Sequence, residues 1–392
     1  MNITTLSSVA RALAVLCLAL AASRASAQAC GNTERLPFDR AYGVSADGTI
    51  VVGYRLIGRA ILWSEEAGTF DIGNLGNTPA KPQAVSADGR TVVGYSATSS
   101  YLLPAFRWSD SDGMQNLDTL LGNSEATAVS SDGSVVVGTA YNQWGFGGDP
   151  RVFRWTETTG MQDLGRWGRG QAWAYAVSAD GTVLAGYVRE AQFPFIETAF
   201  RWSANDGFRG VANGHAFGMS ADGNVIVGEA LYDGTKWLAF RWTTTTGLQW
   251  LGTLSGHGAV SSARGVSADG RVVVGLSADS GVVRPFRWTE VGGMMEIRTV
   301  GSFASALAVS GDGRTVVGSD TVIDGNGNGY EQAFRWVSNL ADVNGDGFLN
   351  ADDFDQFAAA FESGDPAGDF NHDSFVNGDD YDAFAEAFEA GC

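Results

Sequence analysis

The stretch Gly43-Val-Ser-Ala-Asp47-Gly-Thr-Ile-Val-Val-Gly53 decides the fold of this chain of 392 residues, because the chain carries seven close versions of it. The turn aspartates of the seven versions are Asp47, Asp88, Asp132, Asp180, Asp222, Asp269 and Asp312. Their spacing averages about 44 residues, the length of one propeller blade or a similar β repeat. Asp-Gly between β-branched runs favours a hairpin, because glycine accepts the positive φ that the turn needs.

Two more phrases follow in the repeats. One ends in tryptophan, as in Ala105-Phe-Arg-Trp108, and its copies end at Trp63, Trp108, Trp155, Trp202, Trp242, Trp288 and Trp336. The other, as in Gly113-Met-Gln-Asn-Leu117, closes most units. Each unit therefore offers four short strands, which predicts an all-β domain over residues 30–338, a seven-bladed β-propeller. A β-helix and a pair of β-sandwiches are the alternatives.

Within the tryptophan phrase, side chains two residues apart share one face of a strand. Phe106 and Trp108 therefore face one side of the predicted sheet and Arg107 faces the other. Both faces of a blade are covered by neighbouring blades. We expect the aromatic residues to pack in the core and the arginine to bury its stem while its head finds a partner.

The last part of the chain differs sharply in charge. Residues 340–392 hold eleven Asp and three Glu without one Lys or Arg, so they carry fourteen of the nineteen net negative charges. Binding to nucleic acid rests on clustered Lys and Arg, so this charge balance argues against a nucleic-acid partner. We predict a separate acidic domain over residues 339–392.

This acidic domain contains two loops with the sequence pattern of EF-hand calcium sites, in which oxygen ligands stand at positions 1, 3, 5, 7, 9 and 12. The predicted ligands of the first loop are Asp342, Asn344, Asp346, the Phe348 carbonyl, Asn350 and Asp353. Those of the second loop are Asp369, Asn371, Asp373, the Phe375 carbonyl, Asn377 and Asp380. Ser374 replaces the glycine that eases the turn in the first loop, so we expect two Ca²⁺ sites, the second being weaker.

An amphipathic helix is predicted after each loop, because aromatic residues recur at spacings of three and four. They are Phe354, Phe357 and Phe361 after the first loop, and Tyr381, Phe384 and Phe388 after the second. Two calcium loops with one helix each predict a small α-helical, EF-hand-like domain.

The N-terminus has the pattern of an export signal over residues 1–29. Arg11 precedes an apolar run over residues 12–22, and small residues end at Ala25-Ser26-Ala27 or at Ala27-Gln28-Ala29. The run is too short to span a membrane as a helix. We therefore expect a secreted or cell-surface protein, whose mature chain keeps only Cys30 and Cys392 of the three cysteines. We predict a disulfide between these two; lipidation of Cys30 and attachment of Cys392 to the envelope are the alternatives.

Two family resemblances add to this interpretation. The repeats resemble those of the extracellular HAF-repeat family over about residues 34–338, through Ala-Phe-Arg-Trp at 105, 199, 239 and 333, although the leading histidine of that family is absent. The tail resembles a GC-type dockerin, down to its ending Gly391-Cys392. That resemblance implies a cohesin-like or envelope protein as partner. The residues at loop positions 10 and 11, Ala351-Asp352 and Gly378-Asp379, depart from the Ser-Thr pairs of cellulosomal dockerins.

Residues that could carry catalysis are sparse. The three histidines, His215, His257 and His372, look like separate loop residues, and Glu197, Glu229 and Asp233 look like isolated loop carboxylates. Because connections alternate between the two faces of a blade, the variable ones should all lie on one face. They span residues 139–151, 187–198, 229–238 and 252–264. Their aromatic residues, with one more on a nearby connection, are Tyr141, Trp144, Phe146, Trp167, Phe193, Phe195, Tyr232 and Trp237.

These observations favour an exported, noncatalytic recognition or scaffold protein. Aromatic loop residues suit glycan or protein ligands, and the acidic tail would provide a calcium-dependent attachment module. Two alternatives stay open: a glycan-active hydrolase or lyase that carries a dockerin, and a purely structural surface protein.

Overall fold

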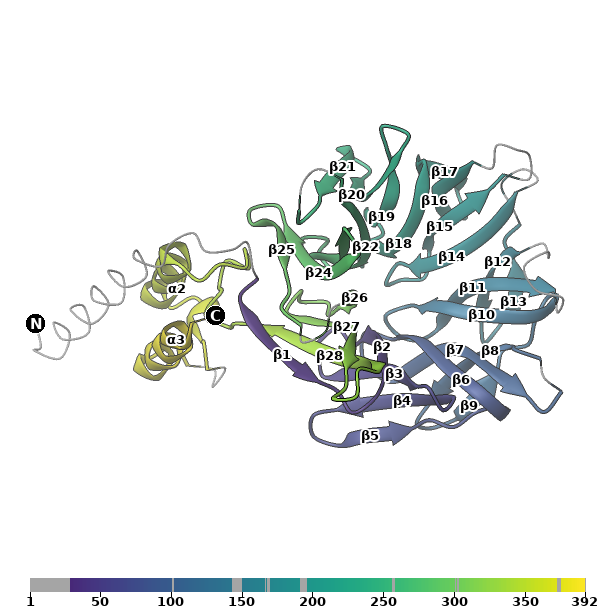
Figure 1. Cartoon of the computed structure of the whole chain (residues 1–392), viewed down its shortest axis with the longest axis horizontal. Helices are drawn as coiled ribbons and strands as arrows, with labels where there is room; N and C mark the ends of the chain where they lie inside the picture. Colours follow the sequence, from purple (N-terminus) through teal and green to yellow (C-terminus); the bar gives the residue numbers. More distant parts are fainter. Residues whose placement is uncertain are drawn as a thin grey trace, which may run out of the picture.

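The computed structural model describes residues 29–391 except 101, 143–149, 166, 168, 169, 191–195, 256, 257, 300, 302 and 372–374. Residues 1–28 of the predicted export signal and Cys392 lie outside these residues, whereas Ala29, the last residue of that predicted signal, is described and buried. The described chain forms a ring of β-sheets with a small helical module at one side, next to β1 (Gly31–Arg35) and β25 (Gly293–Glu296) (Figure 1).

The described strands form seven antiparallel sheets of four strands each, which confirms the predicted seven-bladed β-propeller. Blade 1 comprises β2 (Arg40–Val44), β3 (Ile50–Arg55), β4 (Arg59–Ser64) and β5 (Gly68–Asp71). Blade 2 comprises β6 (Gly76–Val85), β7 (Thr91–Thr98), β8 (Ala105–Ser109) and β9 (Gly113–Asn116). Blade 3 comprises β10 (Gly122–Val129), β11 (Val135–Asn142), β12 (Arg151–Thr156) and β13 (Gly160–Asp163).

The remaining blades continue the same order around the ring. Blade 4 comprises β14 (Gln171–Val177), β15 (Val183–Arg189), β16 (Glu197–Ser203) and β17 (Gly207–Ala212). Blade 5 comprises β18 (Gly214–Met219), β19 (Val225–Tyr232), β20 (Lys236–Thr243) and β21 (Gly247–Gly252). Blade 6 comprises β22 (Val260–Val266), β23 (Val273–Asp279), β24 (Val282–Thr289) and β25. Blade 7 comprises β26 (Ser305–Val309), β27 (Thr315–Ile323), β28 (Gly329–Ser338) and β1.

The first strand of the chain closes the ring. β1 pairs antiparallel with β28, from Gly31 opposite Ser338 to Arg35 opposite Phe334, and so supplies the outer strand of blade 7. The first strands of neighbouring blades contact one another, which places them around the centre of the ring. The two ends of the propeller are thereby held in one sheet.

The repeated Ser-x-Asp-Gly phrase forms a turn with its own hydrogen-bond network. Ser178 Oγ donates to Asp180 Oδ1 over 2.6 Å and accepts the Val183 N–H over 3.0 Å, while Gly181 has a φ of 70°. The turns also join the blades, because the Ala179 N–H donates to the Ala221 carbonyl at 2.8 Å. The phrase therefore closes a hairpin and links it to the next blade.

Ser178→Ala tests this turn. Ser178 is almost fully buried, so its removal leaves a buried N–H without its side-chain acceptor and should cost about 1–3 kcal/mol of stability. Thr182→Ala is the matched control, because the exposed Thr182 hydroxyl also contacts Asp180. We expect Thr182→Ala to stay within about 0.5 kcal/mol of the parent. Denaturant unfolding measures both variants, and equal losses would argue against the role given to Ser178.

The glycine that ends each phrase is required because two strands approach closely there. A Cβ built on Gly138 would lie 1.9 Å from the Glu125 carbonyl oxygen of the neighbouring first strand. The register of that strand shifts between Ala126 and Ala128, which marks a bulge. Only glycine allows this approach.

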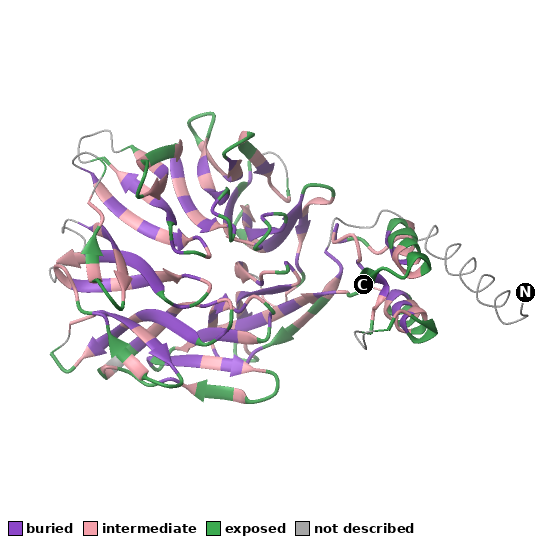
Figure 2. Ribbon diagram, turned by 180° about the vertical axis from the view of Figure 1, so that it is seen from behind, coloured by how far each residue is buried: buried purple, intermediate pink, exposed green. Residues whose placement is uncertain are grey.

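The tryptophan phrase packs as predicted. Its phenylalanines in blades 2–7 are at most 1% exposed, and Figure 2 shows the buried residues following the strands of every blade. Four arginines of the phrase donate from Nε to the turn glycine carbonyl of the next blade; the pairs are Arg107 to Gly133, Arg154 to Gly181, Arg201 to Gly223 and Arg241 to Gly270. The arginine head thus fastens one blade to the next.

The helical module contains α2 (Ala351–Ser363), η1 (Pro366–Gly368) and α3 (Gly378–Ala390). Phe357 and Phe384 stack with their ring centroids 4.1 Å apart at the centre of a cluster that includes all six predicted aromatic residues. None of the helices in the described part of the chain has the length and hydropathy needed to cross a membrane.

Candidate functional site

The first calcium-type loop is closed by hydrogen bonds from its own backbone. Asp353 Oδ1 accepts the Asn344 N–H over 3.2 Å and Oδ2 accepts the Asn350 N–H over 3.0 Å. Asp342 Oδ2 accepts the Gly347 N–H over 2.9 Å. Gly347 has a φ of 89°, a conformation that favours glycine at this position. The loop backbone is therefore folded around the predicted first and last ligands.

The three carboxylates predicted as ligands in this loop are buried. Asp342 is 5% exposed, Asp346 7% and Asp353 0%. Burial raises the pKa of Asp342 to about 6; nearby Arg287 opposes the rise, and Asp353 and Asp346 add to it. Burial also raises the pKa of Asp353. A cation among these groups would favour their ionised forms.

The second loop repeats the hydrogen bonds of the first at its described positions. Asp380 Oδ1 accepts the Asn371 N–H over 3.1 Å, and Oδ2 accepts the Asn377 N–H over 2.8 Å. Here the N–H donors, led by that of Asn377, hold the pKa of Asp380 below its ordinary value. His372, the predicted ligand Asp373, and Ser374 lie outside the described residues. The described parts of the two loops share these two hydrogen bonds, but the last carboxylates differ in the direction of their pKa shifts.

The predicted ligands fit a hard cation in one specific respect. Asp342 Oδ1 is buried and has no hydrogen-bond partner, and such an orphaned oxygen is suited to bind Ca²⁺. No group of three His, Cys, Asp or Glu side chains among the described residues has the arrangement of a metal cluster. The predicted set of the first loop combines three carboxylates with Asn344 and the Phe348 carbonyl, and its fit to a cation rests on the orphaned oxygen of Asp342.

The asparagines at loop position 9 have an additional structural role. Asn350 caps α2 by accepting the Asp352 N–H, and Asn377 caps α3 by accepting the Asp379 N–H, both over 2.8 Å. Each capping box also uses the last carboxylate of its loop. Loop and helix are therefore fixed together at Asp353 and again at Asp380.

The first loop rests on the outer edge of the propeller. The Cys30 N–H donates to the Gly347 carbonyl at 3.0 Å, and Arg287 Nη2 donates to the Gly345 carbonyl at 2.8 Å. A Cβ on Gly292, in the turn between β24 and β25, would lie 2.1 Å from the Asp346 carbonyl oxygen. The helical module is thus seated on blade 6 through its first loop.

A second candidate site surrounds His215, which was expected to be an ordinary loop residue. That expectation is wrong, because His215 lies in β18 with its side chain 16% exposed. Its Nδ1 is 3.0 Å from Glu229 Oε1 and its Nε2 is 2.9 Å from Glu197 Oε2. Glu197 and Glu229 were expected in loops, but they lie in β16 and β19. Strands that continue beyond the repeated phrases bring the three side chains together.

The hydrogen bonds of this cluster depend on where its protons lie. A neutral imidazole donates from one ring nitrogen only. Both contacts of His215 are therefore hydrogen bonds only if the ring carries two protons or a carboxyl is protonated. Burial opposes ionisation of Glu229, but the hydrogen bond from His215 keeps its pKa below the ordinary value. The imidazole also occupies the space between the two carboxylates.

Aromatic rings extend the cluster across blades 4 and 5. Trp237 stacks on His215 with ring centroids 5.1 Å apart, and Tyr187 meets His215 edge-on at 4.3 Å. Trp173 stacks on Tyr187 at 4.6 Å. Arg189 lies over the Trp173 ring and pairs with Glu197 at 2.6 Å. We call these residues, with Glu229, the His215 cluster.

The variable connections are shorter than expected. β19 and β20 continue to Tyr232 and from Lys236, so Asp233 lies in a three-residue connection instead of a long loop. Of the other predicted aromatic residues, Trp167 and Tyr232 are exposed, while Trp144, Phe146, Phe193 and Phe195 lie outside the described residues, as does His257. Strand direction places the His215 cluster at the same end of the blades as these connections.

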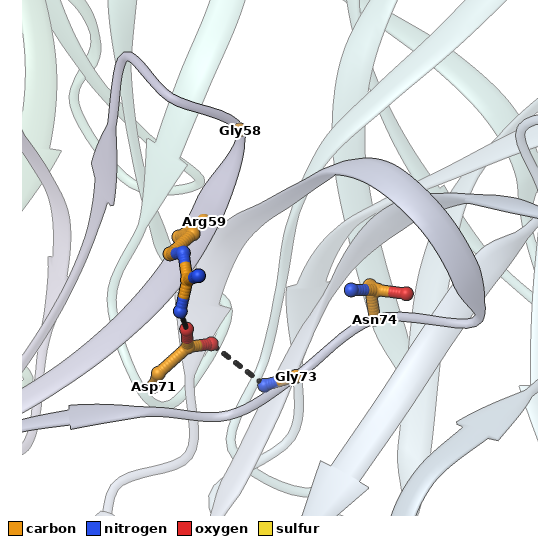
Figure 3. Close-up of a pocket in the computed structure, with 5 residues that line it drawn as sticks. All are labelled: Gly58, Arg59, Asp71, Gly73 and Asn74. Atoms are coloured by element: carbon orange, nitrogen blue, oxygen red, sulfur yellow. Dashed lines mark hydrogen bonds and ion pairs between the residues drawn. The ribbon is translucent and has the colours of Figure 1, made fainter.

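A pocket at the rim of blade 1 is a repeated structural feature. Gly58, Arg59, Asp71, Gly73 and Asn74 line it, and Arg59 pairs with Asp71, which accepts the Gly73 N–H (Figure 3). Blade 3 has the same arrangement, with Arg151 paired to Asp163 and the Gly165 N–H donating to Asp163. The lining groups therefore fasten β4 to β5, and we assign no chemistry to this pocket.

Comparison with known proteins yields structural similarity alone. No protein-family model and no curated protein matches the chain. The β-propeller domain of the Trilobed protease from Pyrococcus furiosus, described as having an open velcro topology, is 13% identical with a TM-score of 0.52 over 76% of this chain and 95% of that one. At this identity the likeness shows the β-propeller fold and nothing further. In this chain β1 closes the last blade.

Two further solved structures are similar to a lower degree. A putative TolB from Agrobacterium tumefaciens is 16% identical with a TM-score of 0.43, covering 68% of this chain and 93% of that one. TolB from Acinetobacter baumannii is 11% identical with a TM-score of 0.43, covering 79% of each chain.

Proposed function

We propose that this chain is an exported, noncatalytic recognition or scaffold protein. Its propeller would bind a glycan or protein ligand at the end of the blades that holds the His215 cluster. The observation that carries this proposal is the position of the imidazole between Glu197 and Glu229. A glycosidase needs an open space between its two carboxyl groups for the substrate, whereas here the ring fills that space. Stacked aromatic and paired charged groups at such a place suit binding.

The helical module would act as a calcium-dependent, dockerin-like attachment module. In the first loop Asp342, Asn344, Asp346, the Phe348 carbonyl, Asn350 and Asp353 would hold Ca²⁺; the orphaned Asp342 Oδ1 and the formed loop backbone support this. Calcium would supply the positive charge that stabilises the closely spaced carboxylates. In the second loop Asp369, Asn371, Asp373, the Phe375 carbonyl, Asn377 and Asp380 would bind a second, weaker ion.

The partner of this module would be a cohesin-like or envelope protein. Residues 340–392 contain no Lys or Arg, so the module offers acidic and apolar surface and fits a partner with a basic face. Phe348 is 40% exposed and Phe375 70% exposed, one from each loop. These two rings would supply apolar contact area beside the acidic groups.

Arrays of glycans and of envelope proteins test the recognition role of the propeller. We expect binding without turnover, and a loss of at least about tenfold in affinity for Trp237→Ala, which removes the ring stacked on His215. Phe70→Ala is the control, because Phe70 is an exposed aromatic residue in the outer strand of blade 1. Release of reducing sugar would support the glycan-active enzyme instead. No binding and no turnover would favour a purely structural surface protein.

A further inference from the structure

Arg287 breaks the pattern set by its counterparts in the repeat. The arginines at the same position in blades 2–5 donate from Nε to the turn glycine of the next blade. Arg287 Nε has no partner; Nη2 instead donates to the Gly345 carbonyl in the first calcium-type loop, at 2.8 Å. One arginine of the propeller has thus been turned away from the ring and toward the helical module.

The surroundings of Arg287 make this contact electrostatic. Arg287 is 2% exposed, and its Nε and Nη1 are buried without hydrogen-bond partners. The carboxylates that attract it are those of Asp342 and Asp346, which are themselves buried. A buried charge is costly unless an opposite charge compensates it. The guanidinium and these two carboxylates therefore stabilise each other across the contact between blade 6 and the helical module.

We propose that Arg287 is a built-in cation of the first calcium loop, which keeps this loop docked on the propeller when calcium is absent. The proposal rests on calcium binding as the proposed function of the loop. Three carboxylates, from Asp342, Asp346 and Asp353, are balanced by the two charges of Ca²⁺ together with the single charge of Arg287. Without calcium, the positive charge of Arg287 still neutralises part of the negative charge of these carboxylates.

The two cations act against each other. Both are attracted to the buried carboxylates of Asp342 and Asp346, and two positive charges beside the same carboxylates repel one another. Arg287 therefore lowers the calcium affinity of the first loop. By linkage, bound calcium weakens the contribution of Arg287 to docking by the same factor. Arg287 therefore has two effects. It keeps the first loop docked when calcium is absent, and it holds the calcium affinity of that loop at a moderate level.

Arg287→Met tests the proposal in the full-length chain, with Asp369→Asn added to weaken the second site. Calorimetric titration should show calcium affinity of the first loop rising about tenfold, within the usual range of coupling between sites. In EGTA, hydrogen exchange of residues 339–349 should become faster than in the parent. In saturating calcium the difference should shrink. A side chain that only packs would weaken the protein equally in both conditions and would not raise calcium affinity.

Two matched variants separate charge from structure. Arg241→Met removes the equivalent arginine of blade 5, which bonds Gly270 at 3.0 Å; it should leave the calcium affinity unchanged. Arg287→Lys keeps the charge and loses the guanidinium fork, so its calcium affinity should stay near that of the parent. Unchanged or lower calcium affinity in Arg287→Met would overturn this proposal but not the calcium function. Equal calcium affinities in Arg287→Met and Arg287→Lys would do the same. Absence of calcium binding in the parent would overturn the calcium function as well.

Discussion

Asp342→Asn is expected to lower the calcium affinity of the first loop by on the order of 100-fold or more. The substitution keeps the size of the side chain and removes the charge of a predicted ligand whose Oδ1 is buried without a hydrogen-bond partner. Asp369→Asn, at the same position of the second loop, should lower total calcium binding less, because we predict a weaker site where Ser374 replaces glycine. Calorimetric titration of the full-length variants measures both effects.

Asp352→Asn provides the control for this prediction. It removes the same charge from the same loop, at position 11, where the side chain is exposed and is not a predicted ligand. We expect a change of only a few fold, from the loss of a nearby negative charge. Equal losses in Asp342→Asn and Asp352→Asn would show that the loop attracts calcium only through its overall charge. A larger loss in Asp369→Asn would mean that the second loop is the stronger site.

The blades could be predicted from the sequence because each one repeats its own local signals. Asp-Gly marks the first hairpin, and the Phe-Arg-Trp phrase supplies a buried strand with an arginine that reaches the next blade. The closing strand was not predicted, since β1 has no such phrase. A signal was nevertheless present: no Met-Gln-x-Leu phrase follows Trp336, so the seventh unit lacks a fourth strand of its own.

The His215 cluster was missed because its residues lie just beyond the repeated phrases. Glu229 directly follows the glycine of its phrase, and it pairs across the strands with His215. The same position is Tyr187 in blade 4, where it faces Trp173. Comparing the residue after each phrase glycine with the residue opposite it would have brought these side chains together. The period of the repeat gives the register, but which unlike residues meet depends on how far each strand continues.

The contact of Arg287 could not be predicted from local pattern. Its sequence context, Pro285-Phe-Arg-Trp288, differs little from that of Arg241. What differs is the neighbour, because the helical module covers the edge of blade 6 and presents Gly345 to the guanidinium. A tertiary contact between two domains thus gives one copy of a repeated residue a separate role.

A disulfide at Cys30 should link the start of the propeller to the end of the helical module. Cys30 is fully buried and disulfide-bonded, and its partner lies outside the described residues. We predict that this partner is Cys392. The Asn339 N–H donates to the Cys30 carbonyl at 3.2 Å, and Asn339 Nδ2 donates to the Gly391 carbonyl at 2.8 Å. One side chain therefore holds the residue before Cys392 next to the backbone of Cys30.

Cys392→Ser should lower the stability of the mature protein by about 2–5 kcal/mol, as the loss of a bridge that closes a long loop does. The fall in melting temperature should match that of the parent treated with a reductant. Cys17→Ser is the control, because Cys17 lies in the predicted export signal and should be absent from the mature chain. Mass spectrometry of nonreduced peptides identifies the bond directly. A lipid on Cys30, or a Cys392 peptide that is unpaired or joined to another molecule, would contradict the bridge. The contacts of Arg287, of Asn339 and of the first-loop backbone would then hold the helical module on the propeller without it.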